Sequence, residues 1–314
     1  MKHTWKITLT LISIFFLAQV MGLLVVDKYL DHQKTTVSGK PVFQELPYHL
    51  ERPPVEENSS YIYLIVAIII GTLLFMLLIK FKKVMIWKAW FFFGVTACLA
   101  IALVPFIGWL FAGILSIILA FFKIIKPNPY VHNFTEILIY GGLAAIFVPI
   151  LSLTSVIILM LLISIYDFIA VWGIKHMVSM AKFQTENKVF AGIMINYTPE
   201  KTTKPEKTTE LKLKKKIKTP TKEKTETKNA VLGGGDIGFP LLFAGVVMKG
   251  LMLQNTFLAG FLKTLIIPMF ATISLMLLFM LAKKNKFYPA MPFLTLGCAA
   301  GYGVLMIIEI LILV

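Results

Sequence analysis

The chain has 314 residues, 58% of them hydrophobic and 15% charged, and its formal net charge is +15. Soluble domains are usually about 45–50% apolar and about 25% charged, so this composition excludes an ordinary soluble protein and indicates an integral membrane protein. The positive charge does not indicate nucleic-acid binding, because nucleic-acid readers depend on arginine and the only arginine is Arg52. The cysteines and histidines lack the spacing of a zinc site, so we expect no metal and no cofactor.

Stretches of about 20 apolar residues, the length that a helix needs to cross a bilayer core, recur along the chain. We expect about nine such helices and therefore an all-α membrane protein. The first stretch is too long for a signal-peptide core and is interpreted as a retained anchor. The predicted spans are residues 6–26, 60–79, 84–104, 106–124, 134–151, 153–175, 235–253, 257–282 and 290–313.

Two long stretches lack the hydrophobicity of a membrane span. Residues 27–59 contain four prolines and are expected to form an ordered outer loop. Residues 198–230 are rich in Lys, Thr, Glu and Pro, and such a composition buries too little apolar surface to fold. The chain is therefore predicted to divide into an N-terminal transmembrane part (1–190), a flexible cytoplasmic loop (191–230) and a C-terminal transmembrane part (231–314).

The distribution of lysine predicts the orientation, because cytoplasmic loops carry an excess of basic residues. With a cytoplasmic N-terminus, every basic cluster faces the cytoplasm, whereas the outer loop 27–59 has four basic residues against six acids. We therefore predict a multi-pass protein of the cell membrane with a cytoplasmic loop between spans six and seven and an extracytoplasmic C-terminus. The predicted inner clusters contain Lys2 and Lys6, Lys80 to Lys83, Lys123 and Lys126, and Lys283 to Lys286.

Two aspartates lie inside predicted spans, Asp167 in the sixth and Asp236 in the seventh. An ionised carboxylate in the hydrocarbon core costs a few kcal/mol or more, so such groups are usually functional and paired. Counting from Lys175 and from Asn229, both aspartates should lie about 10–12 Å from the inner face. Two carboxyls at one depth can share a proton, so that one activates water while the other donates to a peptide carbonyl, as in aspartic proteases.

Glycines and prolines near the aspartates predict irregular backbone. Gly233, Gly234 and Gly235 precede Asp236, and we expect a discontinuous helix that lines a water-filled cavity. An ordinary helix N-terminus capped by Asp236 is the alternative. The segment 289–292 is expected to be extended and to place a substrate strand beside the aspartates, or else simply to begin the last helix.

These features together resemble the presenilin and signal peptide peptidase family of intramembrane aspartyl proteases. The family's Tyr-Asp, Gly-x-Gly-Asp and Pro-Ala-Leu motifs correspond to Tyr166-Asp167, Gly233-Gly234-Gly235-Asp236 and Pro289-Ala290-Met291, with Met in place of Leu. The flank after Tyr166 looks more like presenilin, and the length and composition indicate a prokaryotic, archaeal-type homologue. The resemblance implies a catalytic role for Asp167 and Asp236 and a substrate-positioning role for Tyr166, Gly233, Gly235, Pro289, Ala290 and Met291.

The resemblance also implies the partners, which are the bilayer and the transmembrane helices of substrate proteins. Homo-oligomerisation or accessory subunits remain open. Since an unwound substrate must find new backbone partners in lipid, we expect it to pair as a strand with residues 289–292 or with residues 189–196. Whether the chain cleaves itself near Ile193 and Met194 is also open.

Two other classes of membrane protein carry comparable acidic residues. A cation- or proton-coupled transporter is the alternative function, because broken helices and buried carboxylates are transporter features. The two halves of the chain show no internal symmetry, which argues against this class. Prepilin-type peptidases carry a Gly-x-Gly-Asp motif but have fewer spans and lack the Tyr-Asp and Pro-Ala-Met segments.

Other charged residues besides the aspartates also fall within the predicted spans. Glu136, Glu309 and Lys249 are close enough to span ends to reach an interface, so no chemistry is expected of them. Lys263 lies deeper, and we predict that it pairs with Glu309 near the outer face.

Overall fold

The structure is a computed structural model that describes residues 5–173, 180, 183–184, 187, 189–197, 228–253, 256–282 and 288–313. These residues form long helices and one two-stranded antiparallel sheet. The helices are α1 (Trp5–Tyr29), α2 (His32–Ser38), α3 (Ser60–Lys80), α4 (Val84–Ile107), α5 (Trp109–Ile124), α6 (Pro129–Phe147), α7 (Leu153–Phe168), α9 (Gly234–Leu251), α10 (Phe257–Thr264), α11 (Ile266–Leu281) and α12 (Met291–Leu313), with short turns η1 (Pro47–His49), η2 (Val148–Ile150) and η3 (Ile169–Gly173); the strands are β1 (Gly192–Tyr197) and β2 (Lys228–Gly233).

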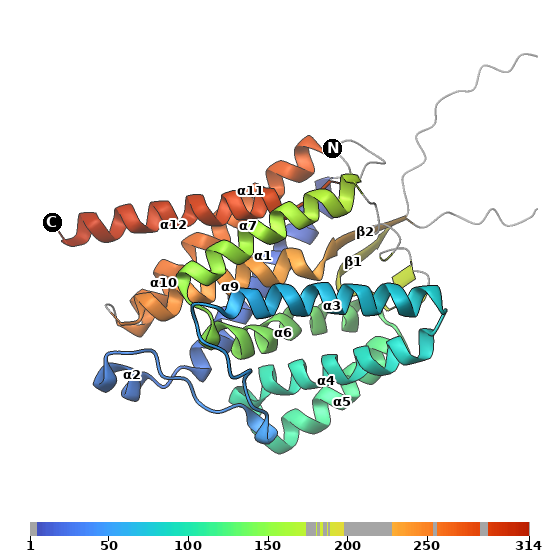
Figure 1. Cartoon of the computed structure of the whole chain (residues 1–314), viewed down its shortest axis with the longest axis horizontal. Helices are drawn as coiled ribbons and strands as arrows, with labels where there is room; N and C mark the ends of the chain where they lie inside the picture. The colour runs from blue at the N-terminus through green and yellow to red at the C-terminus, as the bar shows by residue number, and fades with distance from the viewer. Residues whose placement is uncertain are drawn as a thin grey trace, which may run out of the picture.

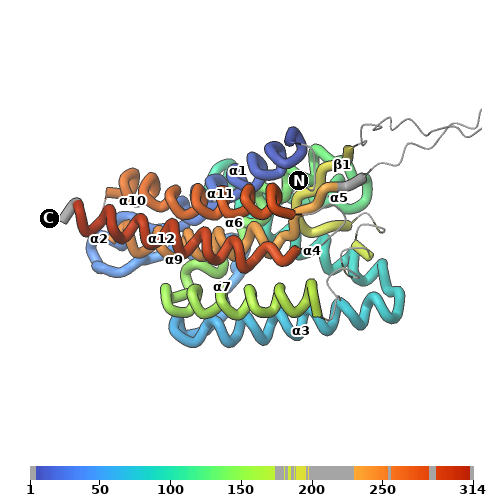
Figure 2. Tube along the Cα trace, turned by 90° about the horizontal axis from the view of Figure 1, so that it is seen from above, coloured from blue at the N-terminus to red at the C-terminus, as the bar shows by residue number. Residues whose placement is uncertain are grey.

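The apolar helices run alternately between two ends of the molecule (Figures 1 and 2). One end, which we call the hairpin end, carries β1 and β2 and the starts of α9 and α12. The opposite end carries α2 and the loop that follows it. Within the described residues, eight helical segments are long and apolar enough to cross a membrane, and α5 is a shorter apolar helix. The prediction of an all-α membrane protein with about nine spans is therefore confirmed.

Residues 192–197 and 228–230, which the sequence placed in or beside a flexible loop, form strands instead. β1 pairs with β2 in register, so that Gly192 lies opposite Gly233 and Met194 lies opposite Val231. Most of the chain between these strands lies outside the described residues, and the predicted division into three parts remains a prediction.

Helix α9 lies at the centre of the bundle, whereas α3 lies at its edge (Figure 2). In the apolar stretch of α9, 67% of the residues are buried, against 11% in α3. The main core around α9 includes Leu11 and Phe15 of α1, Leu159 of α7 and Leu275 of α11. The outward faces of α3 and α5 instead expose large apolar side chains, as lipid contact requires.

Glycines allow the closest approach of helices in this bundle. Lipid tails are as apolar as leucine side chains, so helix association in a membrane depends on close packing and on small residues. A Cβ atom added to Gly142 of α6 would lie 2.0 Å from the backbone oxygen of Cys98 in α4. A Cβ atom on Gly22 of α1 would lie 2.3 Å from a methyl carbon of Leu241 in α9. These contacts set the spacing of α4 and α6, and of α1 and α9.

The loop at residues 30–59 is ordered and is attached to several helices. The backbone oxygen of Glu57 accepts hydrogen bonds from Ser155 Oγ at 2.6 Å and Ser152 N at 3.3 Å, both at the start of α7. The Glu57 side chain lies 3.1 Å from Lys249 Nζ, and the Lys249 side chain is 9% exposed. Lys249 therefore reaches an acid of this loop whose own side chain is 57% exposed.

The predicted pair between Lys263 and Glu309 is confirmed. Lys263 Nζ lies 2.7 Å from Glu309 Oε1, which joins α10 to α12. Glu309 is thus paired within the bundle rather than directed to an interface.

The close approach at Gly142 yields a test of the fold. Gly142→Ala should lower the melting temperature, because a methyl group cannot fit against the α4 backbone and overpacking costs about 1–3 kcal/mol. Gly71→Ala on α3 is the matched control, since nothing lies within 4 Å of its added Cβ. Thermal unfolding of the purified protein in detergent measures both variants, and equal melting temperatures would contradict the packing described here.

Candidate active site

Asp167 lies in the last turn of α7, before the π-helical turn η3. Its side chain is directed inward, and the residue is 4% exposed. Met291 N donates to Asp167 Oδ2 at 3.1 Å, and the Ala290 amide also donates to this carboxyl. The Pro-Ala-Met segment therefore contacts the first aspartate through its backbone, and the Met side chain takes no part in that contact.

Asp236 lies in the first turn of α9, directly after β2. Gly233 is the N-cap of α9 and has an extended backbone, with φ −66° and ψ 149°. The Gly233 amide donates to the Asp236 carboxyl, so the acid reaches back to the N-cap as in a capping box. The expected discontinuous helix is wrong, because α9 is regular from Gly234 onward and the chain before it is a strand. The alternative, an ordinary helix N-terminus, is what the structure has, with Gly233 rather than Asp236 at the N-cap.

The glycines of this motif leave room for neighbouring side chains and are not required by unusual dihedral angles. A Cβ atom on Gly233 would lie 3.3 Å from Asp236 Oδ2, so a side chain there would crowd the carboxyl. Gly235 is exposed, and its added Cβ would touch only the ring of Phe239 at 3.4 Å. Gly234 lies closest to another helix, with its added Cβ 2.7 Å from the Tyr140 hydroxyl.

The structure brings the two aspartates together at the hairpin end. Helices α7, α9 and α12 pack against one another there, and the charges of Asp167 and Asp236 act on each other. Asp236 is partly exposed and Asp167 is buried. Two carboxyls from different helices thus share one site with backbone donors around them.

The Pro-Ala-Met segment is extended only in its first half. Pro289 and Ala290 are non-helical and buried, whereas α12 begins at Met291. Leu294 N donates to the Ala290 oxygen at 3.0 Å. The expectation of an extended segment through Pro292 is wrong, and the alternative holds from Met291 onward, where the segment begins the last helix. Pro292 lies in the first turn of that helix, where a missing amide hydrogen costs nothing.

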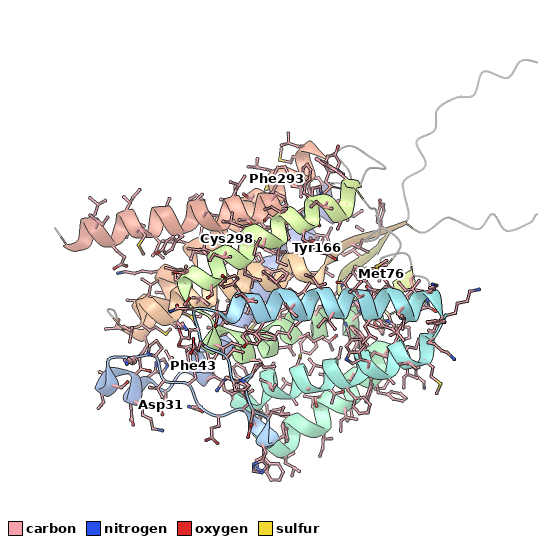
Figure 3. The ribbon with its side chains drawn as sticks, in the orientation of Figure 1. Asp31, Phe43, Met76, Tyr166, Phe293 and Cys298 are labelled. Atoms are coloured by element: carbon pink, nitrogen blue, oxygen red, sulfur yellow. The ribbon has the colours of Figure 1, made fainter. Side chains whose placement is uncertain are left out.

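Tyr166 is placed between α7 and α3 (Figure 3). Its hydroxyl lies 3.5 Å from Thr72 Oγ1 on α3. This contact joins the helix of Asp167 to a helix at the edge of the bundle. The predicted role of Tyr166 in substrate positioning remains a prediction.

Asn133 of α6 occupies the outer edge of β1, a feature that the sequence analysis missed. Its Nδ2 donates to the Met194 oxygen at 2.9 Å, and its Oδ1 accepts from Met194 N at 3.0 Å. Met194 therefore directs its backbone N–H and C=O groups away from β2. In an antiparallel sheet the residue opposite does the same, so the N–H and C=O groups of Val231 point away from β1, toward the far edge of β2. Among the described residues, no backbone group pairs with that far edge.

Glu136 is buried and paired, so the expectation that it reaches an interface is wrong. The residue is 1% exposed, and its carboxylate lies 2.6 Å from Lys123 Nζ. Lys123 is 2% exposed and therefore belongs to the interior rather than to a basic loop. Sequence spacing could not show this pair, since the two residues are on different helices.

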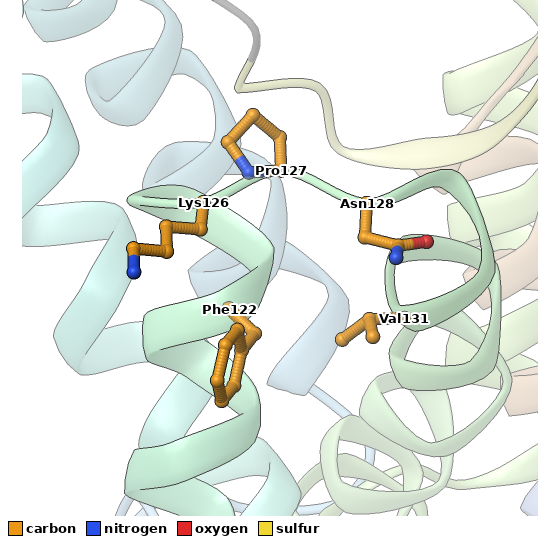
Figure 4. Close-up of a pocket in the computed structure, with 5 residues that line it drawn as sticks. All are labelled: Phe122, Lys126, Pro127, Asn128 and Val131. Carbon is orange, nitrogen blue, oxygen red and sulfur yellow. The ribbon is translucent and has the colours of Figure 1, made fainter.

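Other features of the surface lie apart from the aspartates. A shallow hollow of about 630 Å³ at the turn between α5 and α6 is lined by Phe122, Lys126, Pro127, Asn128 and Val131 (Figure 4).

Within the residues that the structure describes, no group of three or more His, Cys, Asp or Glu side chains could hold a metal ion.

The fold defines a polytopic membrane protein, and two acidic residues, from α7 and from α9, lie at one end of its helices. The sequence model of the family described as signal-peptide peptidase, presenilin aspartyl protease matches residues 13–310. The chain therefore belongs to this family, and it is an intramembrane aspartyl protease. No curated protein matches the chain. The transporter alternative is not favoured.

Two solved structures of a presenilin family intramembrane aspartate protease share the fold. The structure in the P2 space group has a TM-score of 0.58 and 16% identity, covering 96% of this chain and 97% of that chain. The structure in the C222 space group has a TM-score of 0.59 and 15% identity, covering 96% and 99%. The backbone arrangement is therefore similar despite low sequence identity.

The contact between Met291 and Asp167 can be tested directly. Met291→Pro removes the donor and should lower cleavage of a transmembrane reporter by about 10-fold or more, because a small displacement of a reacting group can cost as much as 100-fold. Met291→Leu keeps the donor and a similar volume, and it should cleave at a rate close to that of the parent. Reporter cleavage in proteoliposomes measures both, and loss in the Leu variant would show that the side chain matters instead.

Proposed function

We propose that Asp167 and Asp236 are the catalytic pair and that they activate water to hydrolyse peptide bonds in transmembrane segments. The observation that carries this proposal is the meeting of two carboxyls from α7 and α9 at the start of α12. Two carboxyls that share one largely buried site do not both ionise readily, so we expect the pair to hold one proton. This is the arrangement that acid–base hydrolysis by aspartic proteases requires.

The proposed reaction uses each carboxyl in turn. The ionised carboxyl takes a proton from water, whose oxygen attacks the carbonyl carbon of the peptide bond, while the protonated carboxyl donates to the carbonyl oxygen. A proton then passes to the departing amine as the C–N bond breaks. Backbone donors from Met291, Ala290 and Gly233 hold the carboxyls in place during these transfers.

We further propose that the substrate is a transmembrane helix that unwinds and adds to the free edge of β2. Unwound backbone needs new hydrogen bonds in lipid, and an exposed strand edge supplies them. The outer edge of β1 is occupied by Asn133, so the edge proposed from the sequence, residues 189–196, is partly covered. The edge of β2 leads along the chain from Val231 to Asp236, which would bring a paired strand toward the carboxyls.

The proposed orientation places the hairpin end in the cytoplasm. Lys80, Lys82, Lys83 and Lys126 lie at the turns of this end, as the positive-inside rule requires of cytoplasmic loops. The N-terminal start of α1 lies at the same end, and the C-terminus lies at the other (Figure 1). Homo-oligomerisation, accessory subunits and cleavage of the chain itself stay open. The bond between Ile193 and Met194 lies within β1, where Ile193 is buried, so self-cleavage there would require the strand to open.

The catalytic assignment predicts complete loss of activity in two variants. Asp167→Asn and Asp236→Ala should each abolish cleavage of a transmembrane reporter, because neither retains a pair of carboxyls that can exchange a proton. Their melting temperatures in detergent should stay close to that of the parent. Glu57→Gln, which changes an acid remote from the pair, is the control and should still cleave. Residual cleavage in either Asp variant would rule out the assignment.

Pairing of the substrate with the edge of β2 predicts an effect on substrate affinity, separate from the effect of the aspartates on catalysis. Val231→Pro removes the outward amide hydrogen of β2 without removing a bond to β1, so it should raise KM by several-fold, as expected for about 1 kcal/mol per hydrogen bond. Val231→Ala keeps that hydrogen and controls for the lost side chain. Steady-state kinetics with a reporter helix measures KM for both variants. Equal KM values in Val231→Pro and Val231→Ala would argue against substrate pairing at β2.

A further inference from the structure

Four polar side chains form a buried cluster between α5 and α6, which we call the α6 polar cluster: Lys123, His132, Glu136 and Tyr140. Lys123 Nζ lies 2.6 Å from Glu136 Oε1 and 3.2 Å from His132 Nδ1. The Tyr140 hydroxyl donates to Glu136 Oε2. All four residues are less than a tenth exposed. His132, Glu136 and Tyr140 follow one another at intervals of four residues, which places them along one face of α6.

Stability alone does not account for this cluster. A buried ion pair contributes little net stability compared with apolar residues of the same volume, because both charges must leave their solvent. Such a pair is directional and costly to break, so it favours one arrangement of the surrounding elements over the alternatives. The question is then which elements the cluster holds.

The cluster contacts both sides of the junction between the hairpin and α9. His132 Nε2 lies 2.8 Å from the Gly192 oxygen at the start of β1. Since a carbonyl oxygen only accepts, Nε2 carries the hydrogen, and Nδ1 accepts from the Lys123 ammonium. On the other side, the Tyr140 hydroxyl lies against Gly234, the first residue of α9, where an added Cβ would be only 2.7 Å away.

These two contacts lie on either side of one backbone hydrogen bond. Gly234 N donates to the Ala191 oxygen at 3.1 Å, so the start of α9 and the start of β1 are joined directly. Asp236 lies two residues after Gly234 in the same helical turn. The Tyr140 ring also lies beside the next turn of α9, since a Cβ atom added to Gly238 would be 3.7 Å from it.

We infer that the α6 polar cluster positions Asp236, with Tyr140 and Glu136 as positioning residues that act through Gly234 and the hairpin. This inference rests on the proposed catalytic role of Asp236. The cluster holds the first turn of α9 from behind, while the Gly233 amide holds the carboxyl itself. Loss of the cluster should therefore affect the chemical step more than substrate binding.

Tyr140→Phe removes one hydroxyl and leaves the ring packing unchanged. It should lower kcat for a transmembrane reporter by about 10-fold, as expected for a slightly displaced reacting group, and change KM by less than about twofold. Glu136→Gln should act in the same direction. The matched control is Glu309→Gln, which breaks the 2.7 Å pair with Lys263 between α10 and α12. The control should lower the melting temperature and leave kcat unchanged.

A double-mutant cycle separates positioning from a general loss of packing. Gly234→Ala should lower kcat in the parent, because its methyl group meets the Tyr140 hydroxyl. In the Tyr140→Phe background the same change should cause no further loss, since the nearest remaining atoms would be 3.4 Å away. Non-additivity of this kind indicates direct coupling of the two sites.

The outcomes distinguish this inference from the function on which it rests. Full kcat in Tyr140→Phe, an equal loss in Glu309→Gln, or independent effects of Gly234→Ala and Tyr140→Phe would each overturn the positioning role. If Asp236→Ala, measured alongside, is inactive, such a result leaves the catalytic assignment standing. If Asp236→Ala still cleaves, the catalytic assignment itself is wrong.

Discussion

Backbone amides at the starts of two helices hold the two aspartates, and the rest of the site depends on these contacts. The first turn of a helix leaves amide hydrogens without partners, and its positive dipole end favours a carboxylate. Asp167 takes its donors from Ala290 and Met291 at the start of α12, and Asp236 takes its donor from Gly233 at the start of α9. Acidic groups that would be costly in lipid are thereby satisfied inside the protein.

The same constraint explains why three acids elsewhere in the structure each meet a lysine. Glu57 meets Lys249, Glu309 meets Lys263, and Glu136 meets Lys123. Each acid lies on a different element from its base, so each pair joins two parts of the chain. In a bilayer, where apolar packing offers little drive for association, such directional contacts specify which helices become neighbours.

The hairpin places the backbone hydrogen-bonding groups of a strand beside the two aspartates, which lie on helices. A strand that runs directly into α9 carries backbone hydrogen-bonding groups up to the third residue before Asp236. Asn133 covers one edge of the sheet, and the opposite edge faces away from it. In the proposed function, a substrate that loses its helical hydrogen bonds replaces them on this edge of β2, next to the carboxyls proposed to cut it.

The sequence by itself determined that the chain is a membrane protein with about nine spans, and it determined the order of the three motifs. Apolar length and the cost of a charge in lipid act locally, so these features can be derived from composition and spacing. Only the tertiary structure decided that residues 228–233 form a strand, that Asn133 covers β1, and that Glu136 is buried with Lys123. Each of these depends on which segments distant in the chain become neighbours, and the free energy of such contacts does not exist until the helices have packed.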